Sequence, residues 1–146
     1  MLAQDGSSAR ARRGARELLI KALYQWQIAG HSPDELLQQF AALPEYPRVD
    51  QAYFEDLLVA VLGDAARLDG LIAAHADRDI SQLDAVGRAV LLLALEELTL
   101  RHDVPTKVII NEAVELAKRY GPAECFRFVN AVADRVAGAM GDRDAS

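Results

Sequence analysis

The sequence predicts an all-α protein in which six or seven helices pack as a bundle within a single domain. Apolar residues recur at helical spacing along almost the whole chain. No segment alternates apolar and polar residues over a useful length, and no Asn-Gly or Asp-Gly pair lies between two such segments, as a β-hairpin would require. The 146 residues, 51% hydrophobic and 26% charged, suit one globular domain with a sizeable core.

The first predicted helix covers residues 9–29, after an N-terminal segment of residues 1–8 that we expect to be flexible. Gly30 ends this helix. Its inward-facing stripe consists of Ala15, Leu18, Leu19, Ala22, Leu23 and Trp26. Residues 32–35, Ser-Pro-Asp-Glu, form the pattern of a capping box and start a short second helix, which the two prolines of residues 43–47 end.

A third helical pattern covers residues 51–75, and Gly63-Asp64 leaves open whether it is one helix or two. Residues 81–84, Ser-Gln-Leu-Asp, predict the cap of the next helix, which extends to about Leu100. That helix is the most hydrophobic of the chain, so we expect it to be central and covered on several sides.

Two further helices complete the chain. Pro105 starts the first of them, which Gly121-Pro122 ends. The last covers residues 123–140, and its inward-facing positions are Phe126, Val129, Val132, Ala133 and Val136. Residues 141–146 are expected to be a frayed tail, so that the folded domain comprises residues 9–140.

The residue types that carry catalysis or bind metals are scattered. The three histidines, His31, His75 and His102, have no second histidine or cysteine at ligand spacing, and we interpret them as surface or helix-terminal residues. Cys125 has no neighbouring histidine and is interpreted as a packed thiol. No Walker loop or dinucleotide-binding fingerprint occurs. The sequence therefore indicates neither an enzyme, nor a cofactor, nor a metal site.

The sequence also shows no pattern typical of a membrane span or a signal peptide. No apolar run approaches the roughly 18 residues of a membrane span, and residues 1–8 lack the apolar core of a signal peptide. The single cysteine excludes an internal disulfide and suits a reducing compartment. We therefore expect a cytoplasmic protein that does not enter a membrane.

Basic charge is concentrated at the start of an otherwise acidic chain. The net charge is −6, yet the first 16 residues carry four arginines and one aspartate, whereas the remaining 130 carry 12 basic and 21 acidic residues. The arginines are Arg10, Arg12, Arg13 and Arg16. Their spacings of three and four predict one broad basic face, which suits an extended polyanion such as RNA.

Two interpretations of this basic face remain. Four arginines oppose the partial positive charge of a helix N-terminus, and a charge placement that works against local stability is typical of a functional site. The alternative is a solvated helix end that binds nothing.

Three segments carry a resemblance to a known family. They read ARRGARELLIKALYQWQ, VPTKVIINEAVELAKRYG and FRFVNAVADRVA, and the match extends from about Arg10 to Ala137. Together they resemble the NusB family of bacterial transcription antitermination factors. The C-terminal motif is the most specific part, and it includes Pro105, Lys107, Asn111, Glu112, Gly121, Asn130 and Asp134.

The resemblance implies a fold and a function. The fold would be a single domain of about seven helices arranged as two small helical bundles. The function would be non-enzymatic: binding of boxA-type single-stranded RNA in ribosomal RNA leader transcripts, as a heterodimer with NusE, a protein of the small ribosomal subunit. The pair would join an antitermination complex on RNA polymerase. Some members form homodimers, and the sequence leaves a homodimer open.

The resemblance also implies an RNA-binding site. The arginine-rich arm falls on Arg10, Arg12, Arg13 and Arg16, the RNA-contacting aromatic of the first helix on Tyr24, and the RNA-facing start of the last helix on Arg127 and Phe128. Arginines would contact phosphates and the two aromatic rings would stack on unpaired bases. The alternative for Tyr24 and Phe128 is an ordinary place in the core.

The chain departs from the family pattern at four places. Gly14 interrupts the arginine run, Leu92 stands where an arginine is common, Gly87 where an acidic residue is common, and Asn130-Ala131 where Asn-Gly is common. These departures bear on NusE binding more than on the fold. Two alternative functions stay open: a non-enzymatic helical protein–protein adaptor, and an accessory domain in ribosomal RNA modification.

Overall fold

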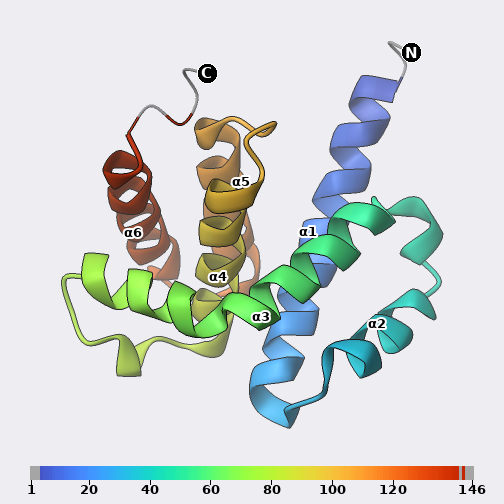
Figure 1. The fold of residues 1–146 in the computed structure, drawn as a ribbon, viewed down its shortest axis with the longest axis horizontal. Helices are drawn as coiled ribbons and strands as arrows, with labels where there is room; N and C mark the ends of the chain where they lie inside the picture. Colours follow the sequence, from blue (N-terminus) through green and yellow to red (C-terminus); the bar gives the residue numbers. More distant parts are fainter. Residues whose placement is uncertain (1–3, 142, 144–146) are drawn as a thin grey trace. The chain divides into compact units, whose positions relative to one another are not determined.

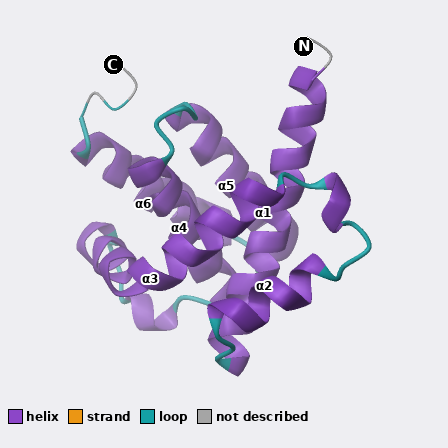
Figure 2. Cartoon of the chain, turned by 45° about the vertical axis from the view of Figure 1, so that its right-hand side comes forward, coloured by secondary structure: helices purple, strands orange, loops and turns teal. Residues whose placement is uncertain are grey.

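The computed structural model describes residues 4–141 and 143. These residues form six α-helices and two short 3₁₀ helices, with no strand among them (Figures 1 and 2). The α-helices are α1 (Gln4–Ala29), α2 (Pro33–Ala41), α3 (Gln51–His75), α4 (Ala85–Leu100), α5 (Thr106–Tyr120) and α6 (Cys125–Ala139). The 3₁₀ helices are η1 (Tyr46–Arg48) and η2 (Ile80–Gln82).

The chain divides into two compact units, Met1–Leu62 and Gly63–Ser146. The first contains α1, α2, η1 and the first half of α3, and the second contains the rest.

The helices of the described residues, with no strand among them, confirm the predicted all-α fold. The question left open at Gly63-Asp64 is resolved, because α3 is continuous from Gln51 to His75. The described residues therefore form six α-helices, the lower of the two numbers expected.

The first unit is closed by aromatic packing and by local caps. The ring of Phe54 lies 5.8 Å from the rings of both Phe40 and Tyr46. Gly30 ends α1 with a φ of 70°, a left-handed conformation that favours glycine. The capping box is confirmed, since Ser32 Oγ accepts from the N–H of Glu35, whose carboxylate accepts from the N–H of Ser32.

The second unit is built around α4, which packs against both α5 and α6 (Figure 1). Every residue from Ala89 to Leu98 is buried, so the expectation of a central helix is confirmed. Asp84 is the N-cap of α4 and accepts from the N–H groups of Val86 and Gly87.

The two ends of the chain differ from expectation. Helix α1 begins at Gln4, so residues 4–8 of the expected flexible segment are helical. Much of the expected frayed tail, residues 142 and 144–146, lies outside the described residues. Arg143 is described, however, and its side chain is only 7% exposed. It is therefore part of the second unit's packing and not of a frayed end.

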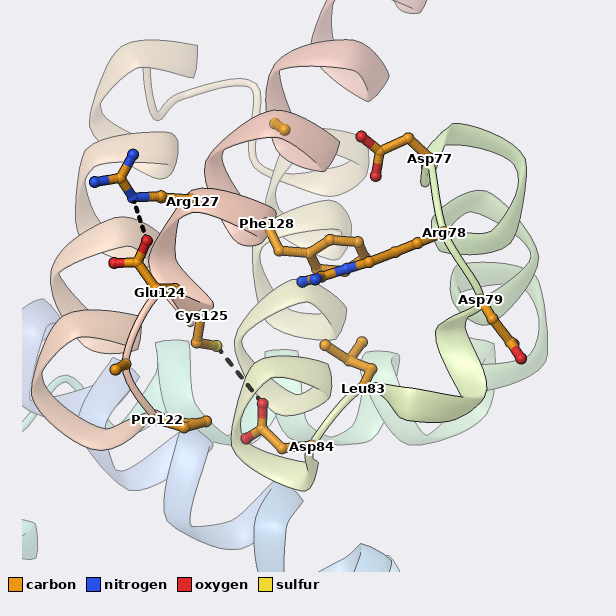
Figure 3. Close-up of a pocket in the computed structure, with 12 residues that line it drawn as sticks. Asp77, Arg78, Asp79, Leu83, Asp84, Pro122, Glu124, Cys125, Arg127 and Phe128 are labelled. Atoms are coloured by element: carbon orange, nitrogen blue, oxygen red, sulfur yellow. Dashed lines mark hydrogen bonds and ion pairs between the residues drawn. The ribbon is translucent and has the colours of Figure 1, made fainter.

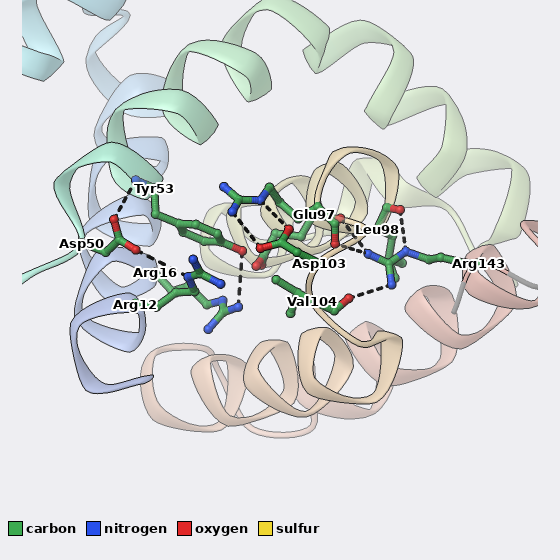
Figure 4. Close-up of polar contacts among 10 residues, drawn as sticks. Arg12, Arg16, Asp50, Tyr53, Glu97, Leu98, Asp103, Val104 and Arg143 are labelled. Atoms are coloured by element: carbon green, nitrogen blue, oxygen red, sulfur yellow. Dashed lines mark hydrogen bonds and ion pairs between the residues drawn. The ribbon is translucent and has the colours of Figure 1, made fainter. Parts of the chain in front are cut away.

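The guanidinium of Arg143 closes the end of α4 and the loop that follows (Figure 4). Its nitrogens donate to the carbonyl oxygens of Glu97, Leu98, Arg101 and Val104 at 2.6–3.2 Å, and to Thr106 Oγ1 at 3.1 Å. Carbonyls at the C-terminus of a helix lack intrahelical donors and carry partial negative charge, which a buried arginine can satisfy.

Two local predictions near α6 also need correction. Phe128, and not Phe126, is the buried aromatic of this helix. Gly121 does follow α5, but its φ is −91°, so no left-handed cap is formed. Glycine is required there for space, because a Cβ would lie 2.8 Å from the carbonyl oxygen of Ala117 and 3.1 Å from Sγ of Cys125.

Within the described residues, no helix combines the length and the apolar character needed to cross a membrane.

Candidate functional site

The arginines of α1 divide into an exposed pair and an inward pair. Arg10 and Arg13 are exposed, whereas Arg12 is half-buried and Arg16 is only 3% exposed. The phase of the helix accounts for this division: Arg12 and Arg16 stand seven residues, about two turns, before the buried Leu19 and before Leu23. The predicted single basic face is therefore wrong as a geometry, since two of its four members turn towards the core.

The inward pair surrounds one aromatic ring (Figure 4). The guanidinium carbons of Arg12 and Arg16 lie 4.3 and 5.4 Å from the ring centroid of Tyr53, and Arg16 donates to the Tyr53 hydroxyl at 3.4 Å. Cation–π contacts of this kind hold both side chains against α3.

Asp50 ties the same part of α1 to the start of α3. Its carboxylate lies 3.6 Å from Nε of Arg12 and accepts from the N–H of Tyr53 at 3.1 Å, while its own N–H donates to the carbonyl of Ala11 at 2.9 Å. Arg12 and Arg16 thus have a structural role in the first unit.

The outward face of α1 retains an arrangement suited to a polyanion. Arg10 and Arg13 lie on it, and Tyr24, with 44% of its side chain exposed, lies further along the same face. Tyr24 is therefore not a core residue, and its ring is available for stacking. The sequence interpretation overlooked Lys21, which is exposed one turn before Tyr24; its spacing of three from Tyr24 was the signal that could have found it.

The second unit holds the other two predicted site residues, beside a cavity of about 690 Å³ (Figure 3). Arg127 is exposed and pairs with Glu124, its Nε 2.9 Å from the carboxylate. Phe128 is 6% exposed, and the guanidinium carbon of Arg78 lies 4.4 Å from its ring centroid. In this arrangement it is the exposed Arg78, and not the ring, that faces solvent.

Cys125 lines the same cavity and is a packed thiol. Burial, and then the neighbouring Asp84 carboxylate 3.7 Å from Sγ, raise the pKa of Cys125 to about 11. A thiol with so high a pKa is protonated at neutral pH and is a poor nucleophile. Across the described residues, no three histidine, cysteine or acidic side chains are gathered as a metal ion would require.

Comparison with known proteins identifies the family. The family model for NusB matches residues 13–138. The chain belongs to the NusB family. Its relatives include the transcription antitermination protein NusB of Alcanivorax borkumensis, 44% identical over 90% of this chain and 87% of that protein. The NusB of Yersinia enterocolitica is 48% identical over 87% of this chain and 92% of that protein.

Solved NusB structures share the fold. NusB of T. maritima aligns with a TM-score of 0.76 and 32% identity, covering 87% of this chain and 90% of that one. A structure of the antitermination factors NusB and NusE in complex with double-stranded RNA aligns with a TM-score of 0.76 and 25% identity, covering 89% of this chain and 98% of the matched chain.

Three departures from the NusB pattern have a local structural setting. A Cβ at Gly14 would lie 2.9 Å from Cγ1 of Val49, so glycine at this position allows the segment that contains Val49 to approach α1 closely. A Cβ at Gly87 would lie 2.9 Å from Cδ1 of Leu83 and 3.0 Å from Sγ of Cys125, so a side chain there would have to displace these neighbours. Leu92 is completely buried in α4.

Proposed function

We propose that this NusB-family protein is a non-catalytic transcription antitermination factor that binds boxA-type RNA of ribosomal RNA leader transcripts together with NusE, and joins an antitermination complex on RNA polymerase. The observation that carries the proposal is the outward face of α1. There, two exposed arginines and a half-exposed tyrosine share one side of a helix in a protein whose net charge is −6.

The chemistry of that face suits RNA. Guanidinium groups bind phosphate oxygens, and their number sets how steeply binding weakens with salt. An exposed tyrosine ring stacks on an unpaired base, a contact worth about 1–3 kcal/mol. The acidic remainder of the protein disfavours non-specific binding of RNA elsewhere.

The predicted residues take different parts in this proposal. Arg10, Arg13 and Tyr24 make the contacts of the first unit, and Arg127 supplies a phosphate contact in the second. Arg12 and Arg16 hold the helix in place around Tyr53. Phe128 supports Arg78, whose exposed guanidinium would meet the RNA first; the Phe128 ring would stack on a base only after Arg78 has moved.

The test is a titration of labelled boxA RNA and of a scrambled RNA of the same composition, with and without NusE, over a salt series. We expect preference for boxA, tighter binding with NusE, and a slope of log affinity against log salt that falls by about 1.4 in the Arg10→Ala/Arg13→Ala variant, about 0.7 for each phosphate contact on single-stranded RNA.

The matched control is Arg48→Ala, which removes an exposed arginine of the same unit outside α1. Its salt slope should equal that of the unchanged protein. Equal affinity for boxA and scrambled RNA at physiological salt, with NusE present, would contradict the proposal and favour the adaptor alternative.

A further inference from the structure

The outward face of α1 extends well beyond the predicted arginines. At about 100° per residue, Arg10, Arg13, Glu17, Lys21, Tyr24 and Ile28 fall within an arc of about 80°. We call this set the α1 stripe. Its charged members extend from Arg10 to Lys21, and Tyr24 and Ile28 follow, so a ligand along the stripe must offer charge at one end and flat or apolar surface at the other.

Ile28 marks the far end of the α1 stripe. With 67% of its side chain exposed, it is the most exposed large apolar side chain in the described part of the chain. It stands four residues after Tyr24, so the two side chains are neighbours on the helix surface. Ile28 and the Tyr24 ring together form a small exposed apolar surface at this end of the α1 stripe.

Lys21 supplies the only formal charge in this part of the chain. Between Leu18 and Pro33 there is no other lysine or arginine and no acidic residue, although the protein carries 22 acidic residues in total. Lys21 is exposed and lies about 4.5 Å along the helix axis from Tyr24. An ammonium group at that distance can reach the phosphate of a nucleotide whose base stacks on the tyrosine.

We infer that Lys21 is a further phosphate contact of the RNA site and that the site extends past Tyr24 to Ile28. This inference rests on the proposed function. The occupant is a single-stranded stretch of RNA: phosphates lie against Arg10, Arg13 and Lys21, one base stacks on Tyr24, and the next base or its ribose covers Ile28. Glu17, in the middle of the stripe, repels phosphate and weakens RNA binding at its own position.

RNA fits the α1 stripe better than an acidic protein does. Arg10, Arg13 and Lys21 lie on one side of the helix with Glu17 between the last two, and Tyr24 and Ile28 follow Lys21 directly. An unpaired strand can offer phosphates to the cations and bases to the ring and the apolar side chain. An acidic partner protein would be held by the charged half alone and would leave Ile28 uncovered.

The experiment measures binding of boxA RNA without NusE, from 50 to 200 mM salt, for Lys21→Ala, Lys21→Arg and Ile28→Ala. One phosphate contact corresponds to a slope of about 0.7, so Lys21→Ala should reduce the loss of affinity over this range by about 2–3-fold, while Lys21→Arg retains the full slope. Ile28→Ala should weaken binding about fivefold with an unchanged slope.

The chain offers matched controls for both positions. Lys118→Ala removes an exposed lysine of the second unit, and Val59→Ala shortens an exposed apolar residue of the first. Neither should alter RNA binding. All positions are exposed, and unchanged melting temperatures would show that the variants are folded.

The outcomes separate the inference from the proposed function. If Arg10→Ala/Arg13→Ala lowers the salt slope but Lys21→Ala does not, the extension along α1 is wrong and the proposed function stands. If Ile28→Ala weakens only the gain in affinity produced by NusE, the apolar end contacts protein and its assignment to RNA is wrong. If the unchanged protein has no preference for boxA even with NusE, both fail.

Discussion

The two units each bury an arginine, and they do so in different ways. In the first unit Arg16, 3% exposed, lies against the ring and hydroxyl of Tyr53. In the second unit Arg143, 7% exposed, is surrounded by four backbone carbonyls and one hydroxyl. Both side chains are buried by contacts within their own unit. An arginine-rich segment therefore cannot be equated with a binding surface until the phase of its helix has been taken into account.

The contrast also predicts different energetic consequences. A guanidinium that donates to several backbone carbonyls at once is difficult to replace, because its loss leaves some of these buried acceptors without a donor. A guanidinium that lies against a ring contributes mainly packing and a cation–π contact. The predictions below test this ranking.

The largest effect is expected at Arg143. Arg143→Ala should lower the free energy of unfolding by about 2–4 kcal/mol, because the buried carbonyls of Leu98 and Val104 lose their guanidinium donors. The carbonyls of Glu97 and Arg101 keep the N–H groups of Arg101 and Val104 as donors. Urea denaturation measures the loss. Arg143→Lys keeps the charge but not the planar arrangement of donors. Its free energy of unfolding should lie between those of Arg143→Ala and the unchanged protein. A loss below about 0.5 kcal/mol in Arg143→Ala would mean that the tail does not close α4 in solution.

The second prediction compares the two faces of α1. Arg16→Ala should destabilise the protein by about 1–3 kcal/mol and leave the salt slope of RNA binding unchanged, since its side chain is buried. Arg13→Ala should change stability by less than about 0.5 kcal/mol and lower the salt slope. Chemical denaturation and RNA titration on both variants provide the comparison. The reverse assignment of the two effects would contradict the division of the arginines.

Much of the fold was accessible from the sequence because local signals set it. The capping box at residues 32–35, the helix-ending Gly30 and the long apolar run of α4 each act through neighbours in sequence, and each prediction is confirmed. The inward turn of Arg12 and Arg16 was also accessible in principle, because these residues continue the buried stripe of Leu19 and Leu23 towards the N-terminus.

Other features depend on contacts between distant residues and could not be predicted. Arg143 meets its acceptors about 40 residues away, so nothing in its own neighbourhood distinguishes it from a disordered tail. Phe126 and Phe128 both border the buried stripe of α6, so periodicity alone does not choose between them. The binding roles of the exposed residues on α1 stay predictions.

Gly14 provides a third test, in which propensity and packing oppose each other. Alanine is favoured over glycine inside a helix by about 1 kcal/mol, so helix propensity alone predicts that Gly14→Ala is stabilising. Its Cβ would lie 2.9 Å from Cγ1 of Val49, however, and we expect a net loss of about 1–2 kcal/mol.

A double-mutant cycle separates the two effects. In a Val49→Ala background the obstructing methyl is absent, and Gly14→Ala should become stabilising relative to that background. Equal effects of Gly14→Ala with and without Val49 would show that the close approach to α1 does not limit this position.

The last prediction concerns an acid that the second unit buries. Glu96 is fully buried, accepts from Nη2 of Arg67 at 2.9 Å, and its other oxygen has no hydrogen-bond partner within the described residues. Burial, and then the nearby Asp64 carboxyl, raise the pKa of Glu96 to about 7, although Arg67 opposes them. Between about pH 4.5 and 7 the carboxyl of Glu96 is therefore protonated in the folded protein and ionised in the unfolded chain, where its pKa is the ordinary 4.5.

The sign of the pH dependence follows from that difference. The stability that the neutral carboxyl provides is present in full below about pH 4.5 and is lost as the pH rises towards 7, by at most about 1.4 kcal/mol per pH unit. The side chain of Glu96→Gln cannot ionise, so the variant does not lose this stability. Its free energy of unfolding, relative to that of the unchanged protein, should therefore increase between pH 5 and 8. Glu115→Gln, an exposed position, is the control. A constant difference between Glu96→Gln and the unchanged protein over this range would show that Glu96 is ionised in the folded state, held there by Arg67.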